Sequence, residues 1–129
     1  MPNKIFVTWK EVEDYIDFVV KETKDIEFAG VYGIPRGGLV MAVMLSDRLG
    51  LPMLMAPCNG ALIVDDIADS GRSLIHYTEN DTQFNKYAIT TFFYHPRSIV
   101  TPHWYFKKKE EGSWIVFPWE YDEDRPKNL

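Results

Sequence analysis

The chain has 129 residues, of which 46% are hydrophobic and 26% are charged, as is typical of one compact domain. The net charge of −5 argues against nucleic acid as a partner, because binding a phosphate backbone needs a basic face, and no apolar run approaches the ~20 residues that cross a bilayer. The acidic N-terminal residues do not resemble a secretory signal, and the single cysteine, Cys58, excludes an internal disulfide, so we expect a cytoplasmic protein with no membrane partner.

Strand-like and helix-like segments alternate along the first three quarters of the chain. In chain order they are a strand at 3–8, a helix from Trp9, a strand at 28–33, a helix at 39–49, strands at 51–56 and 61–65, a helix at 70–78 and a strand at 87–94. Thr8 followed by Glu11 is a capping-box pattern, and Gly50 is a typical residue just beyond a helix end. This alternation predicts an α/β fold with a mainly parallel, twisted sheet flanked by helices.

The C-terminal part of the chain is rich in aromatic residues. Two aromatic runs, at 103–106 and 114–117, flank a polar stretch that contains Gly112, which predicts a small β-hairpin. Most of these rings are equally compatible with a hydrophobic cover over a sheet edge. We expect one domain over residues 1–121 and a charged tail over 122–129.

The most informative segment starts in the continuously apolar strand at 61–65. Two adjacent carboxylates, Asp65 and Asp66, come at its carboxyl end, where open α/β sheets bind ligands. The turn that follows is rich in glycine and hydroxyl groups and leads into a helix, so its backbone N–H groups and the helix dipole favour an anion. Carboxylates beside an anion site suit a ligand with hydroxyls and a phosphate, such as a ribose 5-phosphate. The alternative is an acidic strand end followed by a helix capped by Asp69 or Ser70.

This segment resembles the loop with which type I phosphoribosyltransferases bind PRPP (5-phosphoribosyl 1-diphosphate). The resemblance implies that Asp65 and Asp66 hold the ribose hydroxyls, directly or through Mg²⁺. It also implies that Asp69 lies near the reacting nitrogen of the base. The residues implied to enclose the 5-phosphate are Asp69, Ser70, Gly71, Arg72 and Ser73.

A second glycine-rich turn follows the strand at 28–33. Gly37 and Gly38 allow the backbone to approach an anion, and Arg36 adds a positive charge, although many structural turns contain Gly-Gly. In the family this turn binds pyrophosphate and can carry a cis peptide, which we expect at Arg36–Gly37. The form of the turn resembles the xanthine–guanine branch.

The third element is the Trp114-Ile115 pair near the C-terminus, which resembles the purine-stacking site of the same branch. We expect Trp119 to have a packing role rather than to contact the base. At the position of His95 related enzymes carry a lysine that donates to the 6-oxo group of the purine. His95 can donate there too, or it is a loop histidine without a ligand. The connection over residues 39–64 is shorter than in the usual purine enzymes, which carry a flexible loop there.

Together, the resemblance implies a Mg²⁺-dependent enzyme of purine salvage that transfers phosphoribose from PRPP to a 6-oxopurine (guanine, xanthine or hypoxanthine) and releases pyrophosphate. The alternative is a PRPP- or nucleotide-binding regulatory protein of the same fold without transferase activity, which the short connection favours. The family also implies a homodimer or higher homo-oligomer. The apolar segment 39–49 is a candidate interface, or else part of the core.

Overall fold

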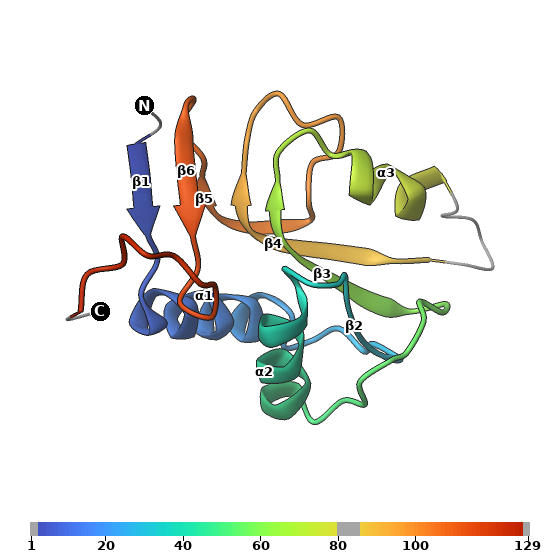
Figure 1. Ribbon diagram of the computed structural model, residues 1–129. Helices are drawn as coiled ribbons and strands as arrows, with labels where there is room; N and C mark the ends of the chain where they lie inside the picture. The colour runs from blue at the N-terminus through green and yellow to red at the C-terminus, as the bar shows by residue number, and fades with distance from the viewer. Residues whose placement is uncertain (1–2, 80–85, 128–129) are drawn as a thin grey trace.

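The computed structural model describes residues 3–79 and 86–127, and strands and helices alternate along most of the chain (Figure 1). The strands are β1 (Asn3–Phe6), β2 (Gly30–Gly33), β3 (Ala61–Ala68), β4 (Ala88–Tyr94), β5 (Trp104–Lys108) and β6 (Ser113–Val116). The helices are α1 (Trp9–Glu22), α2 (Leu39–Leu49) and α3 (Arg72–Glu79). The predicted α/β class is confirmed.

The main sheet has four strands in the order β2-β3-β4-β5, and every neighbouring pair is parallel. Helices α1 and α2 lie on one side of this sheet and α3 on the other (Figure 1). Because side chains alternate along a strand, Leu62 and Val64 of β3 pack in the cluster with α1 and α2, whereas Ile63 packs in the cluster with α3. Burial on both faces explains the continuous apolar run of β3.

The two longer helices begin or end as their sequences predict. The hydroxyl of Thr8 accepts the N–H of Glu11 at 3.1 Å, and the carboxylate of Glu11 accepts the N–H of Thr8 at 3.2 Å, so the capping box that starts α1 is confirmed. Helix α2 ends at Gly50, whose φ of 65° is left-handed. Within the described residues, no helix has the length and apolarity needed to span a membrane.

The predicted C-terminal β-hairpin is wrong. Strand β5 pairs in parallel with β4, and β6 pairs in parallel with β1 in a separate two-stranded sheet, with Asn3 opposite Ser113. Each aromatic run pairs with a strand elsewhere in the chain, and Phe117, at the end of the second run, is fully buried. In β5, Phe106 packs against Tyr15 and Phe18 of α1 while the strand completes the edge of the main sheet.

Two strand boundaries also differ from the prediction. The segment 51–56 forms only a single bridge, between Met53 and Val31, because Pro52 accepts the N–H of Val31 but has no N–H to donate. Strand β3 continues beyond Asp65 to Ala68. Asp65 and Asp66 therefore lie within the last four residues of a paired strand rather than after it.

Helix α2 packs into the core of its own chain through Met41, Ala42 and Leu45, which are fully buried. Leu39 and Val43 are exposed on its outer side. Core packing therefore accounts for one face of the helix, and its use as an interface stays a prediction.

The segment after β6 is tied to the rest of the fold by ionic contacts. Lys4 of β1 lies 3.2 Å from Asp122 and 2.6 Å from Asp124. The guanidinium of Arg125 donates to the carbonyl oxygens of Phe117 and Glu120, at 2.7 and 2.9 Å. Residues 128–129 of the predicted tail lie outside the described part of the chain.

Candidate functional site

The acidic end of β3 holds two carboxylates with few hydrogen-bond donors between them. Asp65 is 7% exposed and accepts the N–H of Asp66 at 2.9 Å and the hydroxyl of Ser73 at 3.3 Å. Asp66 is half-buried and accepts the N–H of Ile67 at 2.8 Å. Burial, followed by the like charge of Asp66, raises the pKa of Asp65 to about 8. The pair is therefore suited to a ligand that brings positive charge or hydroxyl donors.

The Gly37-Gly38 turn packs directly on this acidic strand end. A Cβ on Gly37 would overlap a carboxylate oxygen of Asp66 and lie 2.5 Å from its Cγ, and one on Gly38 would overlap the carbonyl oxygen of Val64. Both positions therefore require glycine for close approach. The structure thus brings together the two turns that the sequence singled out, while the cis peptide lies between Pro35 and Arg36, one bond before the expected one.

The turn from β3 into α3 is shaped by Gly71, whose φ is +83° and whose added Cβ would lie 2.5 Å from the hydroxyl of Ser98. The hydroxyl of Ser70 accepts the N–H of Arg72 at 3.3 Å, at the start of α3. Helix α3 begins at Arg72, and the start of a helix is a region whose backbone N–H groups and dipole favour an anion. A cavity of about 500 Å³ opens here, lined by Ser70, Arg72, Arg97 and Ile99.

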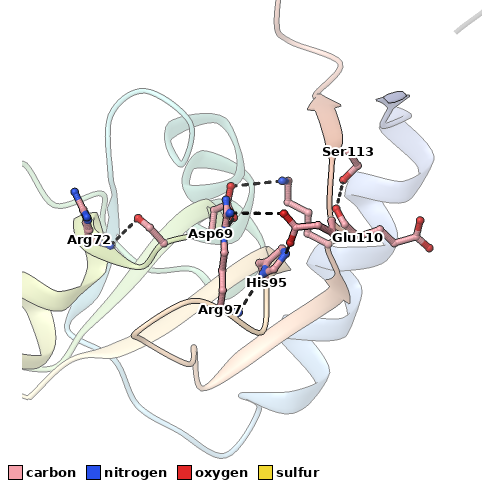
Figure 2. A network of polar contacts seen from close by, with 9 residues as sticks. Asp69, Arg72, His95, Arg97, Glu110 and Ser113 are labelled. Atoms are coloured by element: carbon pink, nitrogen blue, oxygen red, sulfur yellow. Dashed lines mark hydrogen bonds and ion pairs between the residues drawn. The ribbon is translucent and has the colours of Figure 1, made fainter. Parts of the chain in front are cut away.

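Asp69 is held by two cations (Figure 2). Its Oδ1 accepts from Nε and Nη2 of Arg97 at 3.0 and 2.8 Å, and its Oδ2 lies 3.4 Å from Nζ of Lys109. Partial burial alone would raise the pKa of Asp69, but the hydrogen bond from Arg97 and the charge of Lys109 outweigh it and lower the pKa. Sequence reasoning missed both cations as site residues. The sequence signal that could have identified them is a basic residue soon after the end of a parallel strand, where such sheets bind ligands.

His95 lies beside this network and has partners for both ring nitrogens (Figure 2). Its Nδ1 accepts the backbone N–H of Arg97 at 3.0 Å, so the proton is assigned to Nε2, which lies 2.8 Å from the carboxylate of Glu111. The residue is 8% exposed. The ring therefore has no donor left for a ligand unless the contact with Glu111 breaks.

The third predicted element lies apart from the main sheet. Trp114 is on β6, opposite Lys4 of β1, and the residue is 57% exposed, while Ile115 is half-buried. Among the described residues, no hydrogen bond or ring contact links Trp114 to Asp69. The indole is accessible to a ligand.

A second cavity, of about 380 Å³, adjoins the glycine turn. It is lined by Arg36, Gly37, Trp119, Glu120 and Tyr121. Trp119 stacks on Phe117 with ring centroids 4.9 Å apart and planes at 13°. Trp119 therefore packs against Phe117, as predicted, and in addition lines this cavity.

The site and the fold can be compared with known proteins. No family model matches the chain. It is 23% identical over 143 aligned positions to a xanthine–guanine phosphoribosyltransferase of Vibrio atlanticus, covering 93% of this chain and 91% of that protein. It is 28% identical to one of Cereibacter sphaeroides over 70% of this chain and 68% of that protein. A solved purine phosphoribosyltransferase of Pyrococcus horikoshii superposes with a TM-score of 0.81 at 26% identity, covering 97% of this chain and 99% of that one.

The chain has the fold of the type I phosphoribosyltransferases and is similar in sequence to members of that family. Among these proteins it is similar to the xanthine–guanine enzymes, as the turn at Gly37-Gly38 and the Trp114-Ile115 pair predict.

The xanthine–guanine phosphoribosyltransferase of Vibrio atlanticus carries residues that this chain lacks. Its alignment runs over 143 positions, more than the 129 residues of this chain, so the relative has extra residues inside the matched region. Between α2 and β3 this chain forms only one β-bridge and a turn.

Proposed function

We propose that this protein transfers the phosphoribosyl group of PRPP to a purine base, here a 6-oxopurine, and releases pyrophosphate. The observation that carries the proposal is the packing of the Gly37-Gly38 turn on the carboxylates that follow Val64, one loop away from the anion-binding start of α3. The turn and the helix start offer two anion sites on either side of a pair of carboxylates. PRPP has a matching order of groups, with a pyrophosphate, a ribose with two hydroxyls and a 5-phosphate. The named activities of the similar proteins support the same reading.

In this proposal each part of PRPP has its own contact set. Asp65 and Asp66 accept the ribose hydroxyls. The N–H groups and hydroxyls of the turn hold the 5-phosphate, using Asp69 through its backbone together with Ser70, Gly71, Arg72 and Ser73. Arg36 and the N–H groups of Gly37 and Gly38 receive the pyrophosphate.

The carboxylate pair also fits Mg²⁺ as a cofactor. No cluster of three or more metal-ligating side chains occurs among residues 3–79 and 86–127, so the protein alone offers only Asp65 and Asp66. Mg²⁺ is commonly held by one or two carboxylates together with substrate phosphates and water, which matches this donor set. When bound with PRPP, the ion would neutralise negative charge on the departing pyrophosphate.

The reaction joins a nitrogen of the base to C1 of the ribose while the bond from C1 to the pyrophosphate oxygen breaks. The proton on the base nitrogen must leave, and Asp69 is ionised at neutral pH and able to accept it. Trp114 stacks on the purine with Ile115 beside it. Positioning and charge stabilisation supply most of the rate, because no step needs a protein nucleophile.

Replacing Asp69 with asparagine is expected to lower kcat by roughly 100-fold, at the low end for a general base because the two cations weaken its basicity. The amide still accepts a hydrogen bond at Oδ1, so the dissociation constant of PRPP is expected to change less than about threefold. Steady-state kinetics and calorimetry with PRPP measure the two quantities. A large loss of PRPP affinity at unchanged kcat would contradict this role.

The direct test is chromatographic detection of nucleotide after incubation with PRPP, Mg²⁺ and one base at a time: guanine, xanthine, hypoxanthine, adenine or uracil. We expect the monophosphates of the 6-oxopurines. Absence of product with every base, together with binding of PRPP or nucleotide by calorimetry, would instead support a regulatory binding protein. The short connection after α2 is the observation that favours this second candidate, because it leaves less chain to shield the reacting centre from water.

A further inference from the structure

Arg97 lies in the loop after β4, and this loop packs on the turn between β3 and α3. The N–H of Ile99 donates to the carbonyl oxygen of Ser70 at 2.9 Å. The hydroxyl of Ser98 lies against Gly71, 2.5 Å from the position that an added Cβ would take. These contacts hold the loop that carries Arg97 directly against the turn that is proposed to bind the 5-phosphate.

The guanidinium of Arg97 is only partly used by the protein. It has five N–H donors, of which one on Nε and one on Nη2 are bonded to Oδ1 of Asp69, at 3.0 and 2.8 Å (Figure 2). Nη1 lies 3.8 Å from a carboxylate oxygen of Glu111, which is beyond hydrogen-bond distance. Within the described part of the chain the guanidinium makes no other hydrogen bond. The donors on Nη1 are therefore available to a ligand.

Two guanidinium groups border the cavity at this turn. Arg97 lines it together with Ser70, Arg72 and Ile99, and the side chain of Arg97 is 55% exposed, so a solute can reach it. Among residues 3–79 and 86–127, the guanidinium of Arg72 has no hydrogen-bond or ion-pair partner. A guanidinium matches the oxygens of a phosphate with parallel N–H donors. Two such groups from separate segments, beside a hydroxyl, suit an anion that has several oxygens.

The carboxylate of Asp69 would oppose an anion in this cavity if its charge were not balanced. Asp69 directly precedes Ser70, so a phosphate held beside Ser70 lies close to a carboxylate of like charge. Arg97 is bonded to that carboxylate and lines the same cavity, so its positive charge acts on both anions. This arrangement allows an ionised Asp69 and a bound phosphate to be present together.

We propose that Arg97 is a phosphate-binding residue, which donates from Nη1 to the 5-phosphate of PRPP while Nε and Nη2 remain bonded to Asp69. This inference rests on the proposed transferase function. One side chain then joins the phosphate end of the substrate to the carboxylate that accepts the proton of the base. Arg97 contributes to PRPP affinity directly and positions Asp69 as a second effect.

Calorimetry with ribose 5-phosphate and with pyrophosphate, each with Mg²⁺, tests this contact without requiring turnover. Arg97→Met is expected to weaken the binding of ribose 5-phosphate by at least about tenfold, because it removes a charge-assisted hydrogen bond. The Kd of pyrophosphate is expected to stay within about twofold, because its proposed site is the Gly37-Gly38 turn. Arg97→Lys keeps the charge without the planar fork and is expected to recover part of the affinity for ribose 5-phosphate.

Arg48→Met is the matched control. Arg48 of α2 is also an exposed arginine paired with an aspartate, Asp17 of α1, at 2.7 Å. Its removal changes the net charge by the same amount and is expected to leave the affinity for both ligands unchanged. Wild-type affinity for ribose 5-phosphate in Arg97→Met, or an equal loss of affinity for both ligands, would overturn the assignment.

A double-mutant cycle separates a phosphate contact from a role that acts only through Asp69. If Arg97 contacts the phosphate, Arg97→Met weakens the binding of ribose 5-phosphate by at least about tenfold in the Asp69→Asn protein as well as in the wild type. If Arg97 only holds the carboxylate in place, the loss disappears in the Asp69→Asn protein, and that result would refute the contact.

The inference and the proposed function fail in different ways. Binding of ribose 5-phosphate that does not depend on Arg97, in a protein that forms nucleotide, would remove the inference and leave the transferase. Binding that depends on Arg97, in a protein that forms no nucleotide with any base, would remove the transferase and leave the phosphate contact. A wild-type protein that binds neither PRPP nor ribose 5-phosphate would contradict both.

Discussion

Gly38→Ala is expected to weaken PRPP binding by at least about tenfold and to destabilise the fold by roughly 1–3 kcal/mol, as other overpacked sites do. The added Cβ would overlap the carbonyl oxygen of Val64 and lie 3.0 Å from Cα of Asp65. The backbone of Gly38 is helical, with φ of −88°, so the effect comes from contact and not from a disallowed conformation. The turn would have to move away from the acidic strand end. This movement would separate the proposed pyrophosphate site from the proposed ribose site.

Gly50→Ala is the control for this prediction. Gly50 lies at the other end of α2 with φ of 65°, and nothing lies within 4 Å of an added Cβ. The substitution is expected to cost about 1 kcal/mol through its positive φ while leaving PRPP affinity unchanged. Thermal unfolding and calorimetry with PRPP measure both variants. Wild-type affinity in Gly38→Ala would refute the close packing of the two turns as a requirement for binding.

Asp65→Asn is expected to abolish detectable transfer while raising the stability of the protein at pH 8. The raised pKa of Asp65 means that the folded state holds the proton more tightly than the unfolded state does. This contribution is fully present below the unfolded value of about 4 and is lost as pH rises toward 8. The wild type thus becomes progressively less stable relative to the asparagine variant over this range, by at least about 2 kcal/mol at pH 8.

The Tm difference between the two proteins is therefore expected to grow from near zero at pH 4 to at least about 5 °C at pH 8. Asp14→Asn serves as the control for net charge, because Asp14 is a surface residue of α1 paired with Lys10. It is expected to retain transfer and to gain no stability. An Asp65→Asn protein that is less stable than the wild type at pH 8, or that still forms nucleotide at the wild-type rate, contradicts the proposed role of the carboxylate.

Local sequence signals were sufficient for the parts of the fold that short segments determine. The capping pair of Thr8 and Glu11, the terminal Gly50 and the apolar strand before Asp65 each act within a few residues of chain. The same holds for the two turns of the candidate site, which follow β2 and β3 directly.

The pairing of the C-terminal strands could not be read in this way. Ser113 pairs with Asn3 and Trp104 with Thr90, and no local pattern carries information about partners so far apart. A turn-rich stretch between two aromatic runs favours a hairpin on local grounds, but the two strands pair instead with β4 and β1. Lys109 was missed for the same reason, since its place beside Asp69 depends on the pairing of β5 with β4.

The central claim is that the site couples the breaking of PRPP to the joining of a base. The measurement that tests it most directly is the simultaneous quantification of pyrophosphate and nucleotide from PRPP and Mg²⁺, with and without hypoxanthine. We predict equal amounts of the two products with the base present and no pyrophosphate above the spontaneous rate without it. Pyrophosphate release that does not depend on the base, or unchanged PRPP in its presence, would contradict the account.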